Sequence, residues 1–200
     1  MIKICYSSSN INNKKDLEMS DEKDSQMISP VIQVAHMMEL AARTAPKTKG
    51  EDFVKIQIVT GEKPKELAEA MPKFGKERNK TNFDRDGANV AASDALVLIG
   101  LKNALTVGLN CGACGFKSCK ELERAQPADI EFKGPICSYR FVDLGIAVGS
   151  AVKTAQIFNV DNRVMYRPGV VARWTGIVDW DYVLGIPLSA TGKSPYFDRK

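Results

Sequence analysis

The sequence contains very little histidine, since His36 is the only one among its 200 residues. A lone histidine excludes metal sites built from several imidazoles. It also leaves His36 as the one histidine around which a Ser-His-Asp or Cys-His site could be built. His36 stands between the inward-facing positions expected for Ala35 and Met38. We therefore expect a packed or surface histidine at this position.

Long apolar runs are also missing. No stretch approaches the ~18 residues of a membrane span, and the start, "MIKICYSSSNINNKK", has no apolar core of the kind found in secretory signals. The net charge of +4 is mild and its Lys and Arg residues are scattered, which argues against nucleic acid as a partner. We expect a cytoplasmic protein that binds neither nucleic acid nor membranes.

Five cysteines make an odd number, which suits a disulfide framework poorly. In a reducing compartment, clustered cysteines usually indicate metal or redox chemistry. Cys5 is expected to be an incidental free thiol, because it lies in a polar leader over residues 1–29 that lacks periodicity. Met19 is an alternative start to Met1.

Residues 30–200 read as one α+β domain. A helix is predicted from Pro30, where apolar residues recur at helical spacing, up to Pro46. Two strands are predicted, "FVKIQIVTGE" half-buried and "SDALVLIGL" central, with the helix "PKELAEAMPKFGKE" between them. Residues 101–137 then form a cysteine-bearing insertion. After it, "SYRFVDLGIAVGSAVKTAQIFNV" is apolar nearly all round, which predicts a buried helix.

The most specific pattern is C-x2-C-x4-C-x17-C, formed by Cys111, Cys114, Cys119 and Cys137. Two thiolates separated by two residues can hold one metal or one cluster edge from a tight turn. Gly112 and Gly115 allow the backbone to curl there, so that amides can donate hydrogen bonds to sulfur.

Two kinds of centre remain open for these four cysteines. Structural zinc sites favour two paired knuckles, whereas here Cys119 and Cys137 stand alone. One close pair and two single thiolates favour an iron–sulfur cluster, because its corners are spread more widely than the ligands of one ion. A structural zinc site in a non-enzymatic binding or redox-sensing protein is the alternative.

The chain also resembles a known family. The run "NCGACGFKSC" with a distant fourth cysteine resembles small [4Fe-4S] domains of redox-complex subunits. Together with "FKGPIC", "NVDNRVMYR" and "GIPLSATGKSPYFDR", it is similar to uncharacterised proteins described as containing a ferredoxin domain. That resemblance implies a [4Fe-4S] cluster on Cys111, Cys114, Cys119 and Cys137.

The order of elements resembles flavin-dependent nitroreductases as well. The segment "AARTAP" after the first helix and the later "DLGIAVGSAVKTAQIF" carry this likeness. It implies a nitroreductase-like sheet-and-helix core, a dimer built on the long apolar helix, and a pocket for FMN. Arg43, Lys47 and Lys193 are candidates for its phosphate or for a pocket anion, although the Arg-rich entry to the first helix is replaced by "SDEKDSQMISP".

These observations predict an iron–sulfur redox protein. It acts in electron transfer through a redox partner protein, or as a nitroreductase-like oxidoreductase on a small-molecule substrate. Gly145 and Gly149, four residues apart, would let another backbone approach within one chain or across a homodimer.

Overall fold

The computed structural model describes residues 30–197. The predicted leader, with Cys5 and Met19, lies outside the described residues. The helix over residues 30–44 comes first. The following elements are η1 (Thr48–Gly50), β1 (Val54–Thr60), α2 (Lys63–Glu77), α3 (Phe83–Ala91), β2 (Ala95–Leu101), α4 (Cys119–Arg124), β3 (Ala128–Asp129), β4 (Lys133–Gly134), α5 (Ser138–Ile157), β5 (Asp161–Asn162), α6 (Tyr166–Trp174) and β6 (Tyr182–Ser189).

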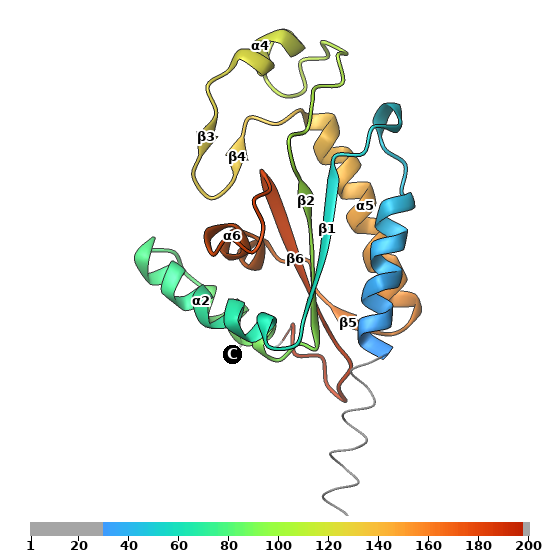
Figure 1. The fold of residues 1–200 in the computed structure, drawn as a ribbon, viewed down its shortest axis with the longest axis vertical. Helices are drawn as coiled ribbons and strands as arrows, with labels where there is room; N and C mark the ends of the chain where they lie inside the picture. Colours follow the sequence, from blue (N-terminus) through green and yellow to red (C-terminus); the bar gives the residue numbers. More distant parts are fainter. Residues whose placement is uncertain (1–29, 198–200) are drawn as a thin grey trace, which may run out of the picture.

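A four-stranded antiparallel sheet, in the order β1-β2-β6-β5, forms the middle layer. The helix over residues 30–44 and α5 lie against one face, and α2 and α6 lie on the other side (Figure 1). Val54, Leu101 and Tyr182 mark one end of the sheet, because they pair across its three longest strands. The cysteine-bearing segment extends beyond this end (Figure 1).

The central strand β2 is buried along its whole length, as its uninterrupted apolar sequence predicts. Its side chains alternate between the two faces. Ala95, Val97, Ile99 and Leu101 enter the core beneath α5, whereas Leu96 and Leu98 enter the core beneath α2 and α6. The strand therefore joins the two halves of the core and fixes the register of its neighbours.

Helix α5 corrects one expectation. Only one side of it is buried, along Leu144, Ala147, Ala151 and Ala155. The opposite side is apolar but exposed, with Val142 at 52% and Ile146 at 41%. No other part of the described chain lies within 4 Å of where a side chain on Gly145 or Gly149 would begin. The helix is apolar nearly all round, but residues 30–197 cover only one side of it.

Helix α3 was not anticipated. It is short, and it begins after Asn82, which adopts a left-handed conformation and caps no helix N–H with its side chain. Asp86 in this helix is buried and bonded to Arg85 and Arg167. Within the described part of the chain, no helix is long and apolar enough to cross a membrane.

Candidate metal centre

The four predicted ligands come from the loop after β2, the start of α4 and the residue before α5. Cys111 and Cys114 lie in the loop that follows β2, Cys119 begins α4, and Cys137 directly precedes α5. All four are free thiols, and all four line one small pocket. The structure therefore brings together the cysteines that the spacing singled out.

The pocket has an exposed side and a buried side. Cys111 is exposed, whereas Cys137 is only 6% exposed and packs with Val107 and Leu122. Phe116 and Cys114 pack against the same small core. A centre held here would be anchored in the protein at Cys137 and open to the surroundings near Cys111.

Backbone conformation shapes the loop around the first two cysteines. Asn110, Gly112 and Gly115 all have positive φ, at 49°, 74° and 87°. The N–H of Gly115 donates to the carbonyl of Gly112, which closes a tight turn around Cys114. Glycine adopts this left-handed backbone without strain. Gly112 and Gly115 therefore let the loop turn so that Cys111 and Cys114 both line the pocket.

Helix α4 is capped in a way that places Cys119. The hydroxyl of Ser118 accepts a hydrogen bond from the N–H of Glu121, and the carboxylate of Glu121 accepts one from the N–H of Lys117. This capping box fixes the first turn of the helix. Cys119 is the first residue of that turn, so its sulfur is presented from an ordered helix end.

The donor set of this pocket consists of four thiols. In residues 30–197, no three His, Cys, Asp or Glu side chains stand close enough together to hold a single metal ion. Four zinc ligands would have to converge at ~2.3 Å from one point. The four cysteines surround a shared pocket, and thiolates are ligands for both an iron–sulfur cluster and a zinc ion.

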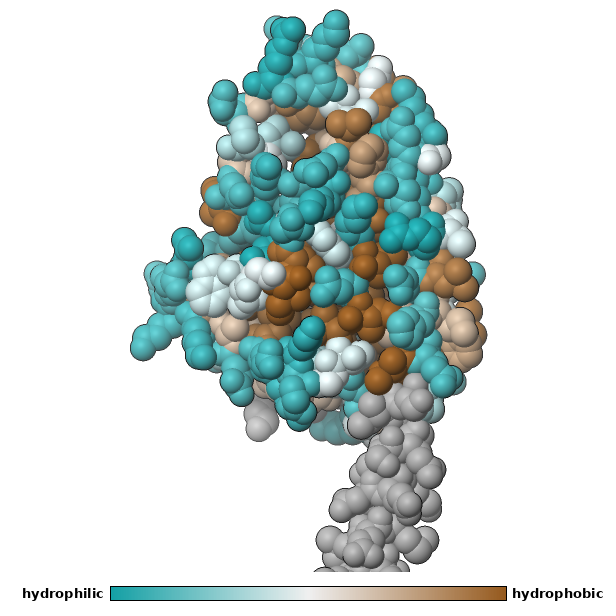
Figure 2. Space-filling model, viewed as in Figure 1, coloured by the Kyte–Doolittle hydropathy of each residue, from teal (hydrophilic) through white to brown (hydrophobic). Residues whose placement is uncertain are grey.

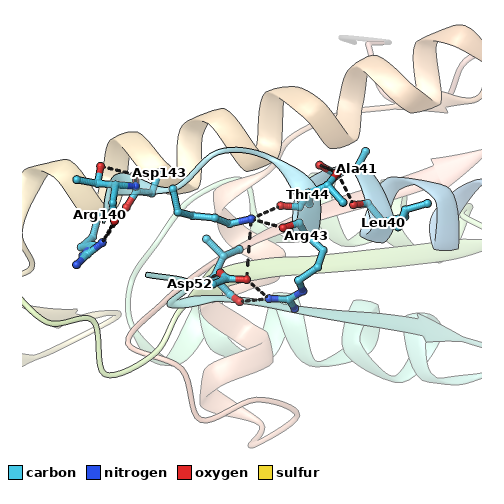
Figure 3. Close-up of polar contacts among 11 residues, drawn as sticks. Leu40, Ala41, Arg43, Thr44, Asp52, Arg140 and Asp143 are labelled. Atoms are coloured by element: carbon cyan, nitrogen blue, oxygen red, sulfur yellow. Dashed lines mark hydrogen bonds and ion pairs between the residues drawn. The ribbon is translucent and has the colours of Figure 1, made fainter. Parts of the chain in front are cut away.

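A buried arginine connects this pocket to the sheet. Arg140, fully buried, lies three residues after Cys137. Its Nε donates to the carbonyl of Leu105 at 2.9 Å, and its Nη1 donates to Asp143 at 3.2 Å and to the carbonyl of Thr48. It also pairs with Glu51. Arg140 thereby ties the start of the cysteine-bearing segment to α5 and η1. Figure 3 shows Arg140 beside Asp143.

Sequence reasoning missed Arg140. The sequence did offer one indication of its role: Arg140 and Asp143 are charged residues three positions apart in a largely apolar helix. That spacing places the two side chains on one helix face. The two side chains form an ion pair.

Arg43 and Lys47, two of the residues proposed for FMN phosphate, already bind groups of the protein. Arg43 donates to Asp52 at 2.6 Å and to the carbonyl of Val54 (Figure 3). Lys47 donates to the carbonyls of Ala42 and Arg43 at the end of the first helix. Burial, the largest effect, lowers the pKa of Lys47 although Asp52 opposes it.

Lys193, the third of these residues, lies elsewhere. It follows the end of β6 near Ser189, whereas Arg43 binds Val54 at the opposite end of the sheet. The strands separate the two ends by about 20 Å at ~3.3 Å per residue. Within one chain, the three basic residues therefore do not surround one phosphate.

A second cavity shares Cys137 with the cysteine pocket. It has a volume of about 360 Å³ and lies between the loop after β2 and the segment from α4 to α5. Its polar lining includes Lys133, Asp181 and Glu123. Thr106, which also lines the cavity, donates a hydrogen bond to the carboxylate of Glu123 at 2.5 Å. This volume is within the range of small-molecule sites.

Sequence comparison links the chain to proteins with a ferredoxin domain. A family model described as "Uncharacterized protein containing a ferredoxin domain (DUF2148)" matches residues 133–199, a stretch that includes Cys137. An uncharacterized protein of Archaeoglobus fulgidus is 49% identical over 165 residues, which cover 82% of this chain and 89% of that protein.

Structural comparison gives the fold. Nitroreductase CinD from Lactococcus lactis, solved in complex with nicotinic acid, has a TM-score of 0.53 at 14% identity and covers 83% of each chain. An oxidoreductase containing FMN has a TM-score of 0.51 at 13% identity, covering 80% of this chain and 67% of that one. Nitroreductase A from Vibrio parahaemolyticus has a TM-score of 0.50 at 12% identity, covering 84% of this chain. The chain spans only 62% of the length of that enzyme. The predicted nitroreductase-like fold is confirmed.

Proposed function

Because this chain belongs to the family of uncharacterized proteins that contain a ferredoxin domain, we propose that it is an iron–sulfur redox protein. Its ligands are Cys111, Cys114, Cys119 and Cys137. The observation that carries the proposal is the shared pocket, which is lined by four free thiols from the segment between β2 and α5. A bound [4Fe-4S] cluster would supply one-electron transfer.

The protein's own part is to hold and insulate this centre. Cys137 and the core around Val107 shield one side of the pocket from water, and burial is one of the features that set the potential of such a centre. The exposed side at Cys111 offers a short path for electrons to a partner protein. A reducing compartment such as the cytoplasm would keep the four thiols available as ligands.

Reduction of the isolated protein tests this function. We expect protein prepared without oxygen to show broad visible absorption that bleaches on reduction and returns on mild reoxidation. Cys137→Ser should weaken this absorption, whereas Cys5→Ser should leave it unchanged. A colourless protein that carries one zinc ion per chain would support the structural zinc site and overturn the proposal.

A second candidate function is that of a flavin-dependent oxidoreductase. The observation that favours it is the fold, which is similar to that of an oxidoreductase containing FMN. Against it, Arg43 and Lys47 bind Asp52 and backbone carbonyls, so they do not form a ready phosphate site. Release of FMN on denaturation, either as isolated or after incubation with FMN, would support the enzyme. Its absence in both preparations would leave the electron carrier.

The same fold suggests a homodimer, which we propose forms along α5. An exposed apolar stripe is made by Val142, Gly145, Ile146 and Gly149. Among the described residues, none lies within 4 Å of where a side chain on either glycine would begin. Met37 and Leu40 add exposed apolar side chains from the neighbouring helix. Figure 2 shows apolar surface at the right edge of the molecule, where these two helices lie. A second copy of this stripe is the partner that would cover it.

A further inference from the structure

Asn110 and Cys119 form a reciprocal pair of hydrogen bonds. The backbone N–H of Cys119 donates to Oδ1 of Asn110 at 2.9 Å. The backbone N–H of Asn110 donates in return to Sγ of Cys119 at 3.4 Å. One residue therefore binds both the backbone and the sulfur of a candidate metal ligand.

The geometry points to Asn110 as a positioning residue of the metal centre, which we infer on the basis of the proposed function. Asn110 directly precedes Cys111, and Cys119 begins α4. The pair thus joins the loop that carries the first two cysteines to the helix that carries the third. It fixes the separation of Cys111 and Cys119 before any centre is assembled.

The conformation of Asn110 makes both bonds available from one residue. Its φ of 49° lies in the left-handed region, which asparagine visits more readily than most residues. In this conformation the backbone N–H faces Sγ, while the side chain reaches the N–H at the start of α4. That N–H lacks a helical partner, as do all those of a first turn.

The bond to sulfur also acts on the electronic properties of the ligand. An N–H donor stabilises negative charge on a thiolate, and hydrogen bonds to sulfur are one of the features that set the potential of an iron–sulfur centre. Groups that orient metal ligands in this way commonly change metal affinity by about 10–100-fold when mutated. Asn110 is expected to raise the reduction potential and to slow the loss of iron.

The test uses the full-length protein as isolated, under reducing conditions without oxygen. Asn110→Gly keeps the left-handed backbone but removes the Oδ1 acceptor. Asn159→Gly is the matched control, because Asn159 has a similar φ of 53° but lies at the far end of α5. Amide hydrogen exchange at Cys119, the rate of iron loss to a chelator, and the reduction potential are measured for each variant.

In Asn110→Gly we expect exchange at the Cys119 amide to be roughly tenfold faster, since its acceptor is gone. Iron loss should be at least about tenfold faster. The reduction potential should be lower, because the backbone N–H of residue 110, which glycine retains, is no longer held against Sγ of Cys119 once the Oδ1 bond is lost. Asn159→Gly should match the unaltered protein in all three. Unchanged exchange at Cys119, or unchanged iron loss and potential, would overturn the inference.

The two kinds of failure are distinguishable. A protein that never holds iron overturns the proposed function, and the effect on potential with it. Exchange at Cys119 is still measurable in that protein and decides whether Asn110 organises the loop. Exchange at Asn110 in Cys119→Ala gives the reciprocal check, and it should increase as its sulfur acceptor is removed.

Discussion

Arg140 and Asp143 form a buried ion pair one turn apart on α5, with Nη1 of the arginine 3.2 Å from Oδ2 of the aspartate. Both side chains are nearly inaccessible to solvent. Asp143 also accepts hydrogen bonds from the N–H and hydroxyl of Thr48. The pair therefore fixes η1 against α5, beside the buried cysteine ligand.

Removal of the arginine should leave Asp143 without its cation inside the protein. We expect Arg140→Met to lower the free energy of unfolding by about 3 kcal/mol or more, because breaking a buried pair leaves an uncompensated charge. Denaturant titration measures this change. Lys102→Met is the control, since it breaks an exposed pair with Asp179 and should change the free energy of unfolding little. Equal losses in the two variants would contradict the role given to Arg140.

Cys137→Ser should reduce the iron content, because it removes the one buried ligand at the base of the pocket. Metal analysis of protein prepared without oxygen checks this. Cys5→Ser provides the control, since Cys5 lies outside the proposed ligand set. Full iron retention in Cys137→Ser would show that the fourth ligand has been wrongly assigned.

A charge on the exposed stripe of α5 should prevent dimer formation. We expect the unaltered protein to be a dimer by light scattering and Ile146→Lys to be largely monomeric, because the lysine would be desolvated between two helices. Lys73→Glu on α2 lies on the other side of the sheet and should leave the dimer intact. A monomeric unaltered protein would rule out this interface.

Lys47 should act as a cap for the first helix. We expect Lys47→Met to lower the free energy of unfolding by about 1–2 kcal/mol, because the carbonyls of Ala42 and Arg43 lose their charged donor. Lys49→Met, at an exposed neighbouring position, should have little effect. If Lys47→Met instead leaves stability unchanged but abolishes FMN binding, Lys47 belongs to a phosphate site.

Tyr196 should make stability depend on alkaline pH. It is 1% exposed and bonded to Ser93, and burial raises its pKa above the ordinary value of 10.0. The folded protein therefore keeps a proton that the unfolded chain loses, so stability falls as the pH rises above about 10. Relative to Tyr196→Phe, the unfolding free energy should fall by up to about 1.4 kcal/mol per pH unit in that range. Parallel pH profiles for the two proteins would contradict this assignment.

Much of the scaffold was readable from local pattern. The apolar run Ala95–Leu101 predicted a central strand, since such runs without polar alternation need cover on both faces. The cysteine spacing also selected the four residues that line one pocket. In both cases the prediction depended on a distinctive local sequence, which is an uninterrupted apolar run in β2 and closely spaced cysteines in the pocket.

Other features depended on contacts that a single segment does not reveal. The apolar sequence of α5 predicted complete burial, but it could not say whether the cover comes from this chain or from another. The role of Arg140 depends on Glu51 and Leu105, which are distant in sequence. Asn110 gave no signal either, because its bonds require the left-handed turn that brings it against Cys119.

The central claim is that four cysteines hold an iron–sulfur cluster, and the iron and sulfide content of full-length protein isolated without oxygen tests it most directly. The account predicts iron and sulfide in equal amounts, about four of each per chain. One zinc ion per chain with neither iron nor acid-labile sulfide would contradict it.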